Sequence, residues 1–187
     1  FMYHPSFGLR VNRRKTSLDD YCKELVNNNL GYVNLDNKII LENPISISNL
    51  PLFERGFVSV QDIGAQFVVD ILNKHEIKFK NVLDACSAPG GKACQILENF
   101  DCNLTALDID DLRLEKVQQN LQRLNLSAKI LLGDASTKKW SNIDKFDLIC
   151  TNPPYNEARG DNNSSKDLYP FMVEKSVKES DNLIMII

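Results

Sequence analysis

The chain has 187 residues, 43% of them hydrophobic, and a formal net charge of −3. That length suits one full domain, or one small domain followed by most of another. No apolar run approaches the ~20 residues of a membrane span, and the small negative charge argues against nonspecific adhesion to nucleic acid over the whole surface.

The first fifty residues predict a small α+β domain. Its expected elements are strands near Gly8–Asn12, Tyr32–Asn34 and Lys38–Leu41, and a helix over Leu18–Asn27. Prolines within residues 43–51 bar regular strand pairing there, which indicates a connector. We therefore place one domain at residues 1–50 and a second at residues 51–187.

This first domain contains a cluster of four cations: Arg10, Arg13, Arg14 and Lys15, with no acidic residue among them. Such a cluster suits contacts with the phosphates of RNA, and we interpret these residues as RNA-binding. The alternative interpretation is a solvated strand edge without a binding role.

The second domain alternates helices with apolar strands, which is typical of a parallel α/β sheet. After a helix at about Ile63–Lys74, the expected strands are Val82–Ala85, Leu104–Asp108, Lys129–Leu132, Phe146–Thr151 and Asn182–Ile187. Apolar residues recur at spacings of three and four from residue 114 to 124, which predicts a helix with one face on the sheet. A complete sheet of this class needs two more strands. We therefore expect a sheet that is incomplete at its C-terminus, truncated after the fifth strand, and a chain that is a fragment or a composite.

The most informative segment follows the first of these strands, at Asp84-Ala-Cys-Ser-Ala-Pro-Gly-Gly-Lys92. Glycines let a backbone approach a ligand without a Cβ in the way. A strand, a glycine turn and a helix N-terminus together form the ligand crevice of an open α/β sheet. The spacing is neither G-x-G-x-x-G nor G-x-x-x-x-G-K-[ST], so a dinucleotide and a nucleoside triphosphate are disfavoured. The alternative is an ordinary connection between a strand and a helix.

Polar residues follow the next three strands, at Asp108, Asp134 and Asn152. The ends of parallel strands meet at one edge of a sheet, where a carboxylate after the second strand can bind both hydroxyls of a ribose. Acidic and amide side chains beside a glycine turn suit a nucleoside with a neutral or cationic tail. This arrangement predicts S-adenosyl-L-methionine rather than a phosphate-bearing cofactor.

Four stretches also carry a family pattern in order and spacing: Leu9-Arg-Val-Asn-Arg13, Gly56-Phe-Val-Ser-Val-Gln-Asp-Ile-Gly-Ala-Gln66, the Asp84–Lys92 turn and Leu107-Asp-Ile-Asp110. Through them, residues 9–150 resemble the ribosomal RNA cytosine-5 methyltransferases of the Sun (Fmu) type. The resemblance implies a Rossmann-like, S-adenosyl-L-methionine-dependent methyltransferase sheet behind an RNA-binding subdomain.

The resemblance also implies roles for individual residues. Asp108 would bind the ribose of the cofactor and Asp134 its adenine ring, while Gln61 and Asp62 would lie at the entry to the catalytic domain. The turn would cradle the methionine end of the cofactor with Asp84, Cys86, Ser87, Ala88, Pro89, Gly90, Gly91 and Lys92.

The chain departs from that family after the fourth strand. The cytosine enzymes carry Asp-Ala-Pro-Cys there, whereas this chain has Asn152-Pro-Pro-Tyr155. From residue 151 the sequence, including Lys166-Asp-Leu-Tyr-Pro-Phe171, instead resembles the adenine-N6 DNA methyltransferases of restriction-modification systems. In this interpretation Asn152 and Pro153 accept the hydrogens of an exocyclic amine, and Tyr155 stacks on the target base. The alternative is a proline-stiffened loop.

Three functions are compatible with these patterns. We expect a ribosomal RNA cytosine-5 methyltransferase of the 16S class. The alternatives are an adenine-N6 DNA methyltransferase and an inactive, cofactor-binding RNA module. The cytosine reaction needs a thiolate that adds to C6, whereas Cys150, inside an apolar strand, is expected to point into the core.

The five cysteines indicate the cellular compartment of the chain. They lack the spacing of a zinc site, and no signal peptide is recognisable, so we expect no metal and a reducing, cytoplasmic location. The expected partner is nucleic acid, with ribosomal RNA favoured and DNA as the alternative. We expect no membrane contact and a monomer.

Overall fold

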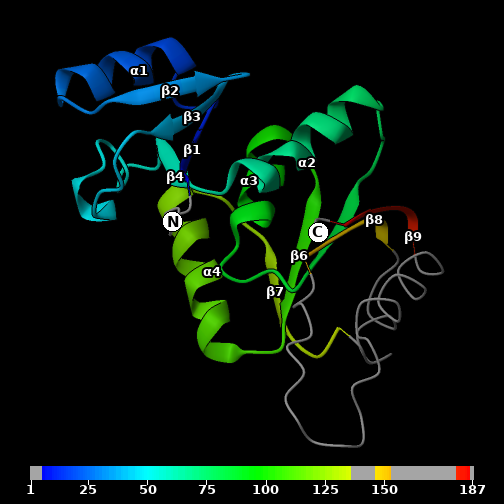
Figure 1. The fold of residues 1–187 in the computed structure, drawn as a ribbon. Coiled ribbons are helices and arrows are strands. Elements are labelled where there is room, and N and C mark those ends of the chain that lie inside the picture. Colours follow the sequence, from blue (N-terminus) through cyan, green and yellow to red (C-terminus); the bar gives the residue numbers. More distant parts are fainter. Residues whose placement is uncertain (1–5, 136–145, 153–179, 186–187) are drawn as a thin grey trace, which may run out of the picture.

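The computed structural model describes residues 6–135, 146–152 and 180–185, which form two sheets with helices packed between them (Figure 1). The smaller sheet is antiparallel, in the order β2-β3-β1-β4. Its strands are β1 (Phe7–Val11), β2 (Tyr32–Leu35), β3 (Lys38–Leu41) and β4 (Val58–Val60). The first three lie within one residue of the expected positions. Strand β4, which follows the connector, is not predicted by the sequence pattern.

Helix α1 (Leu18–Asn27) covers the small sheet and has the predicted bounds. The Ser17 hydroxyl accepts a hydrogen bond from the Asp20 amide at 3.0 Å, which caps the first turn. The connector contains a short 3₁₀ helix, η1 (Ile47–Asn49). One buried core joins the helix, the connector and the sheet, and it includes Leu9, Tyr21, Leu25, Ile39, Leu50 and Val58.

The larger sheet is parallel throughout, in the order β7-β6-β5-β8-β9. Its strands are β5 (Asn81–Ala85), β6 (Asn103–Asp108), β7 (Lys129–Leu132), β8 (Phe146–Thr151) and β9 (Ser180–Met185). Each begins within two residues of its expected position, and the Rossmann-like α/β class is confirmed. The chain moves outward from β5 to β7 and then continues on the other side of β5 with β8. In sheets of this class, such a reversal marks the place where ligands bind, here the carboxyl ends of β5 and β8.

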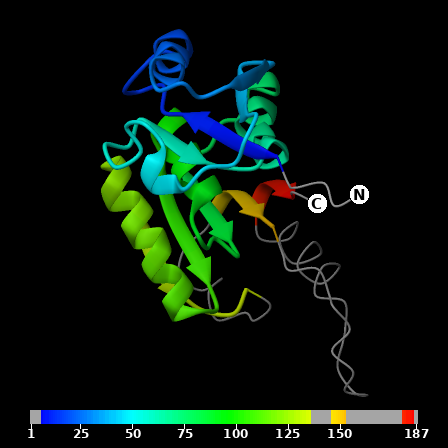
Figure 2. The ribbon, with the colours of Figure 1, turned by 60° about the vertical axis from the view of Figure 1, so that its left-hand side comes forward.

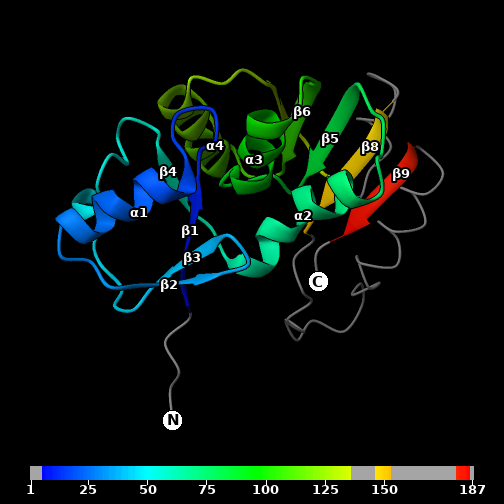
Figure 3. The same ribbon diagram turned by 90° about the horizontal axis from the view of Figure 1, so that it is seen from above.

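Helices α2 (Ile63–Lys74), α3 (Gly91–Asn99) and α4 (Asp111–Leu124) cover one face of the parallel sheet. The expected apolar face of α4 is buried there, through Leu114, Val117, Leu121 and Leu124. No helix within the described ranges is long and apolar enough to cross a membrane. Seen from above, these helices lie between the small sheet on one side and the parallel sheet on the other (Figure 3).

Polar side chains join the two units. Arg123 on α4 donates to the carbonyls of Phe53 and Val58, at 2.8 and 2.9 Å. On another side, the Lys38 ammonium pairs with Asp70 on α2 at 2.5 Å. The turned view shows the small sheet stacked over the end of the larger unit (Figure 2). These bonds fix how the small sheet sits on the helices.

Candidate functional site

The turn between β5 and α3 lies at the carboxyl end of β5 and has an unusual backbone. Cys86 and Gly90 both have positive φ, 57° and 96°. A Cβ on Gly90 would lie 3.2 Å from Val117 Cγ1 and 3.3 Å from Val117 Cα on α4. Glycine is therefore required at position 90, both for its conformation and for the close approach of the turn to α4.

Three carbonyl groups of this turn are held by side chains from distant elements. Arg113 Nη2 donates to the Ala88 carbonyl and Asn120 Nδ2 donates to the Pro89 carbonyl, both at 3.0 Å. The Gly91 carbonyl accepts from Arg10 Nη1 at 2.8 Å. Residues from α4 and from β1 thus fix the shape of the turn.

Asp108 ends β6 and Asp134 follows the adjacent strand β7, as expected. Asp108 is 3% exposed, and its Oδ2 accepts from the Ala88 amide at 3.0 Å, so the carboxylate also orients the turn. The Gly133 amide donates to the Asp108 carbonyl at 2.9 Å, which brings Asp134 beside it. The structure therefore gathers both carboxylates and the turn at one edge of the sheet.

Ile109, next to Asp108, is a further candidate, which the motifs in the sequence do not indicate. Its side chain is 67% exposed although it is apolar. An exposed apolar group beside a carboxylate at the crevice can pack on the flat face of a ring. The signal in the sequence is an apolar residue between two acids directly after a buried strand.

Asp84 and Lys92 form an ion pair beneath the turn. Asp84 is fully buried, and its Oδ1 lies 3.5 Å from Lys92 Nζ. Its Oδ2 accepts from the Ser87 hydroxyl at 2.8 Å. Burial raises the pKa of Asp84, and the charge of Lys92 opposes that rise. These two side chains stabilise the turn from inside the fold.

Four of the five cysteines are poor nucleophiles. Cys150 lies in the core between the sheet and its helices, as expected, and burial raises the pKa of its thiol. Burial also raises the pKa of Cys94 to about 12 and that of Cys102 to about 11. Burial raises the pKa of Cys86 the most, and the negative charge of Asp108 raises it further. These four thiols are protonated at neutral pH.

Asn152 directly follows β8 and is exposed. Thr151 pairs with Ala85, so Asn152 lies at the same end of the sheet as the turn that follows β5. The other two expected catalytic residues, Pro153 and Tyr155, lie outside the described residues.

The four cations of the first domain are separated by the structure. Arg10 is 6% exposed and forms an ion pair with Glu98 at 2.9 Å, so its guanidinium faces α3 rather than solvent. The expectation that Arg10 contacts RNA from the surface does not fit this burial. A strand residue 88 positions before its partner gives no sign of that pairing in the sequence.

The other three cations are exposed, and one of them, Lys15, contacts two further residues. Lys15 Nζ donates to the Arg55 carbonyl at 2.6 Å. Both Lys15 and Arg55 lie over the Phe57 ring, at 5.9 and 5.1 Å from its centroid. We call the resulting patch the cationic surface: Arg13, Arg14, Lys15, Arg55 and Phe57.

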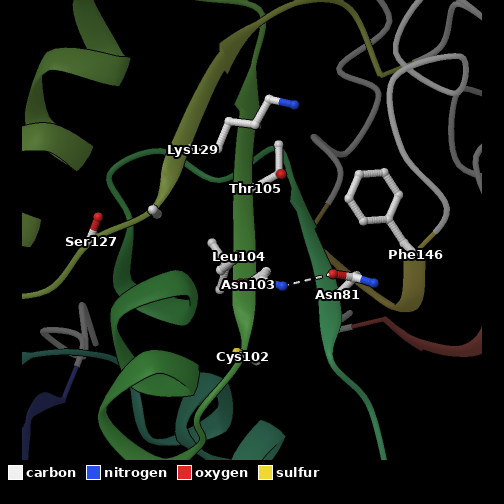
Figure 4. Close-up of a pocket in the computed structure, with 9 residues that line it drawn as sticks. Asn81, Cys102, Asn103, Leu104, Thr105, Ser127, Lys129 and Phe146 are labelled. Atoms are coloured by element: carbon white, nitrogen blue, oxygen red, sulfur yellow. Dashed lines mark hydrogen bonds between the residues drawn. The ribbon is translucent and has the colours of Figure 1, made fainter.

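The opposite edge of the parallel sheet contains a cavity of about 520 Å³. It is lined by the first residues of four strands, including Asn81, Asn103, Lys129 and Phe146 (Figure 4). None of the residues expected at the site lines it. In sheets of this class, ligands bind at the carboxyl ends of the strands, so this cavity is not the crevice.

Known proteins match this chain in sequence. Residues 69–160 match the model of the family described as 16S rRNA methyltransferase RsmB/F. The ribosomal RNA small subunit methyltransferase B of Vibrio vulnificus is 39% identical over 151 residues, which are 78% of this chain and 35% of that protein. Its counterpart in Shewanella oneidensis is 40% identical over 156 residues, 80% of this chain and 36% of that protein. The expected family resemblance is confirmed. The chain spans about a third of the length of these ribosomal RNA methyltransferases.

Solved structures agree with the fold. A methyltransferase homologue from Pyrococcus horikoshii has a TM-score of 0.74 at 23% identity, over 97% of this chain and 62% of that one. NSun6 from the same organism, solved with SFG, has a TM-score of 0.68 at 18% identity, over 81% of this chain and 64% of that one. The fold is that of the Rossmann-like methyltransferases.

Proposed function

We propose that this chain is the cofactor-binding part of a ribosomal RNA methyltransferase that uses S-adenosyl-L-methionine and modifies cytosine at C5. The observation that carries the proposal is the turn after β5, held in a positive-φ conformation beside Asp108 and Asp134 at the carboxyl edge. The relatedness to ribosomal RNA small subunit methyltransferase B supports the substrate class, and the resemblance of residues 9–150 to the cytosine-5 enzymes suggests the target atom.

The residues of this edge fit the chemistry of the cofactor. Asp108 Oδ2 accepts one hydrogen bond from the Ala88 amide, and Oδ1 accepts one from the Asp110 amide. Each oxygen can therefore accept a further hydrogen bond from a ribose hydroxyl. Ile109 offers an exposed apolar surface to the adenine ring, and Asp134 an acceptor for its amino group. When bound, the cofactor supplies a methyl group activated by a sulfonium.

We propose that the cationic surface contacts the phosphates of RNA. Its three cations between residues 13 and 15 are exposed, and Arg55 adds a fourth charge beside a partly exposed aromatic ring. Cations next to an aromatic side chain suit a single-stranded nucleic acid, because phosphates and bases are then bound together.

A charge-reversal experiment tests this surface. The double substitution Arg13→Glu with Lys15→Glu should weaken RNA binding and lower the magnitude of its salt slope by roughly 2, since two phosphate contacts are lost. Lys74 and Lys78 are exposed at a distance in sequence, and their reversal is the matched control. Equal effects of the two double variants would exclude a localised RNA surface.

A second target, an exocyclic amine, is favoured by one observation. Asn152 is exposed at the end of β8, where its amide oxygen can accept hydrogens from an amine, while four described cysteines have raised pKa values. An amine can attack the methyl group directly, whereas cytosine C5 first needs a thiolate on C6.

Nucleoside analysis after incubation with methyl-labelled cofactor and ribosomal RNA separates these reactions. The proposal predicts 5-methylcytidine, and the second candidate predicts N6-methyladenosine. Binding of S-adenosylhomocysteine, measured by calorimetry without RNA, tests the cofactor site independently of either reaction. A chain that binds no S-adenosylhomocysteine would contradict the proposed site.

A further inference from the structure

Arg10 is a buried cation that the proposed chemistry does not use. It lies on β1 of the small sheet, yet the hydrogen-bond partners of its side chain all belong to the segment from Gln61 to Glu98. Its Nε and Nη2 donate to the two carboxylate oxygens of Glu98, both at 2.9 Å. Its Nη1 donates to Gln61 Oε1 at 2.6 Å and to the Gly91 carbonyl at 2.8 Å.

The Gly91 carbonyl is the significant partner, because Gly91 is the first residue of α3 and belongs to the turn of the proposed cofactor site. We propose that Arg10 is a positioning residue that fixes the start of α3, so that the small sheet holds the cofactor turn in its binding conformation. This inference rests on the proposed cofactor site. It assigns to the small sheet a role at that site, in addition to its proposed contact with RNA.

A network of buried amides supports the position of Arg10. Gln61 Nε2 donates to Gln95 Oε1 at 3.1 Å, and Gln95 Nε2 donates to the Gln66 carbonyl at 2.7 Å. Gln66 Nε2 donates back to the Gln61 carbonyl at 3.0 Å. Because its amide nitrogen is committed to Gln95, Gln61 presents its oxygen to Arg10. Fully paired buried networks of this kind hold one arrangement.

The geometry requires the fork of an arginine. The guanidinium binds Glu98 with one edge, while Nη1 reaches both Gln61 and the turn. A lysine ammonium is a point charge on a flexible stem and can neutralise Glu98 without holding the Gly91 carbonyl. Arg10→Lys therefore separates the charge of this residue from its positioning effect. A truncation to alanine would instead leave Glu98 buried and unpaired, and the fold itself would be at risk.

Lys38 provides the matched control. It also joins the small sheet to the helices, but its ion pair with Asp70 and its contact with the Phe67 ring are both on α2 and not at the turn. In calorimetric titrations with S-adenosylhomocysteine, Arg10→Lys should weaken binding roughly tenfold. Lys38→Met should change it by less than about twofold. Comparable losses in both variants, or no loss in Arg10→Lys, would overturn the inference.

Hydrogen exchange of the ligand-free chain gives a second readout. Arg10→Lys should accelerate exchange of the amides at the start of α3, such as that of Cys94, which donates to the Gly90 carbonyl. Lys38→Met should leave those amides unchanged. If the wild type binds no S-adenosylhomocysteine, the proposed function fails, whereas this exchange still decides whether Arg10 holds the turn. Unchanged exchange in Arg10→Lys would refute the positioning role even in a chain that binds the ligand.

Discussion

Polar side chains gather at both edges of the parallel sheet, but the two edges are held in different ways. At the carboxyl edge, Arg10 and residues of α4 hold carbonyl groups of the turn from elements distant in sequence. At the amino edge, Asn103 donates to Asn81 on the neighbouring strand at 3.1 Å, beside a cavity of about 520 Å³. The site that we propose therefore lies where remote side chains hold the backbone, and not at the cavity.

The largest expected difference between the edges is in stability. Asp84→Ala at the carboxyl edge would leave the Lys92 ammonium, in a residue only 8% exposed, without its partner. We expect the free energy of unfolding to fall by about 3–5 kcal/mol, as when one member of a buried ion pair is removed. Urea unfolding followed by circular dichroism measures this change.

The control for that substitution is at the amino edge. Asp147 accepts hydrogen bonds from the amides of Lys80 and Asn81, both at 2.8 Å, and the residue itself is partly exposed. Asp147→Ala should cost only about 1 kcal/mol for each bond lost. If the two alanine variants lost the same stability, the difference between the edges would disappear.

The next effect is on cofactor affinity, and it can be tested within a single strand. Asp108 is the last residue of β6 and Asn103 is the first. Asp108→Ala should weaken S-adenosylhomocysteine binding by roughly 1–3 kcal/mol, because bonds to a charged acceptor are lost. Calorimetry on Asn103→Ala, at the other end of the strand, should give the wild-type affinity. A comparable loss in that variant would place the ligand elsewhere.

Local patterns explain why much of this fold is predictable from the sequence. The helix of residues 18–27 has both its serine cap and its apolar spacing in the sequence, and its observed bounds are the expected ones. The parallel strands are short apolar segments that end in polar residues, and Asp108 and Asp134 come together as that pattern requires.

Interactions between distant segments explain what the sequence could not predict. Arg10 has the local context of an exposed cation, and only the fold brings it to Glu98. Arg55 and Phe57 join Lys15 across 40 positions, and β4, with three residues, is too short for a recognisable alternation. The cavity at the amino edge likewise forms between strands that are separate in the sequence.

The smallest expected effect is the pH dependence of stability, which should have opposite signs for carboxylates at the two edges. Hydrogen bonds from the Asn81 and Lys80 amides hold the pKa of Asp147 below its usual value, so this carboxylate contributes stability above its unfolded pKa of about 4. That contribution is lost as the pH falls through the lower folded pKa. Burial raises the pKa of Asp84, so its contribution is present below the unfolded pKa and is lost as the pH rises through the higher folded pKa.

Urea unfolding between about pH 6 and about pH 3 should therefore separate two asparagine variants. As the pH falls, the wild type should lose stability relative to Asp147→Asn, because protonation removes the negative charge that strengthens its two hydrogen bonds from amides. Over the same range the wild type should gain stability relative to Asp84→Asn, because the raised pKa of Asp84 makes the folded state bind this proton more tightly than the unfolded state does. If the free energy of unfolding of the wild type, relative to each variant, changed with pH in the same direction, the two carboxylates would experience similar environments. That result would contradict the difference between the two edges.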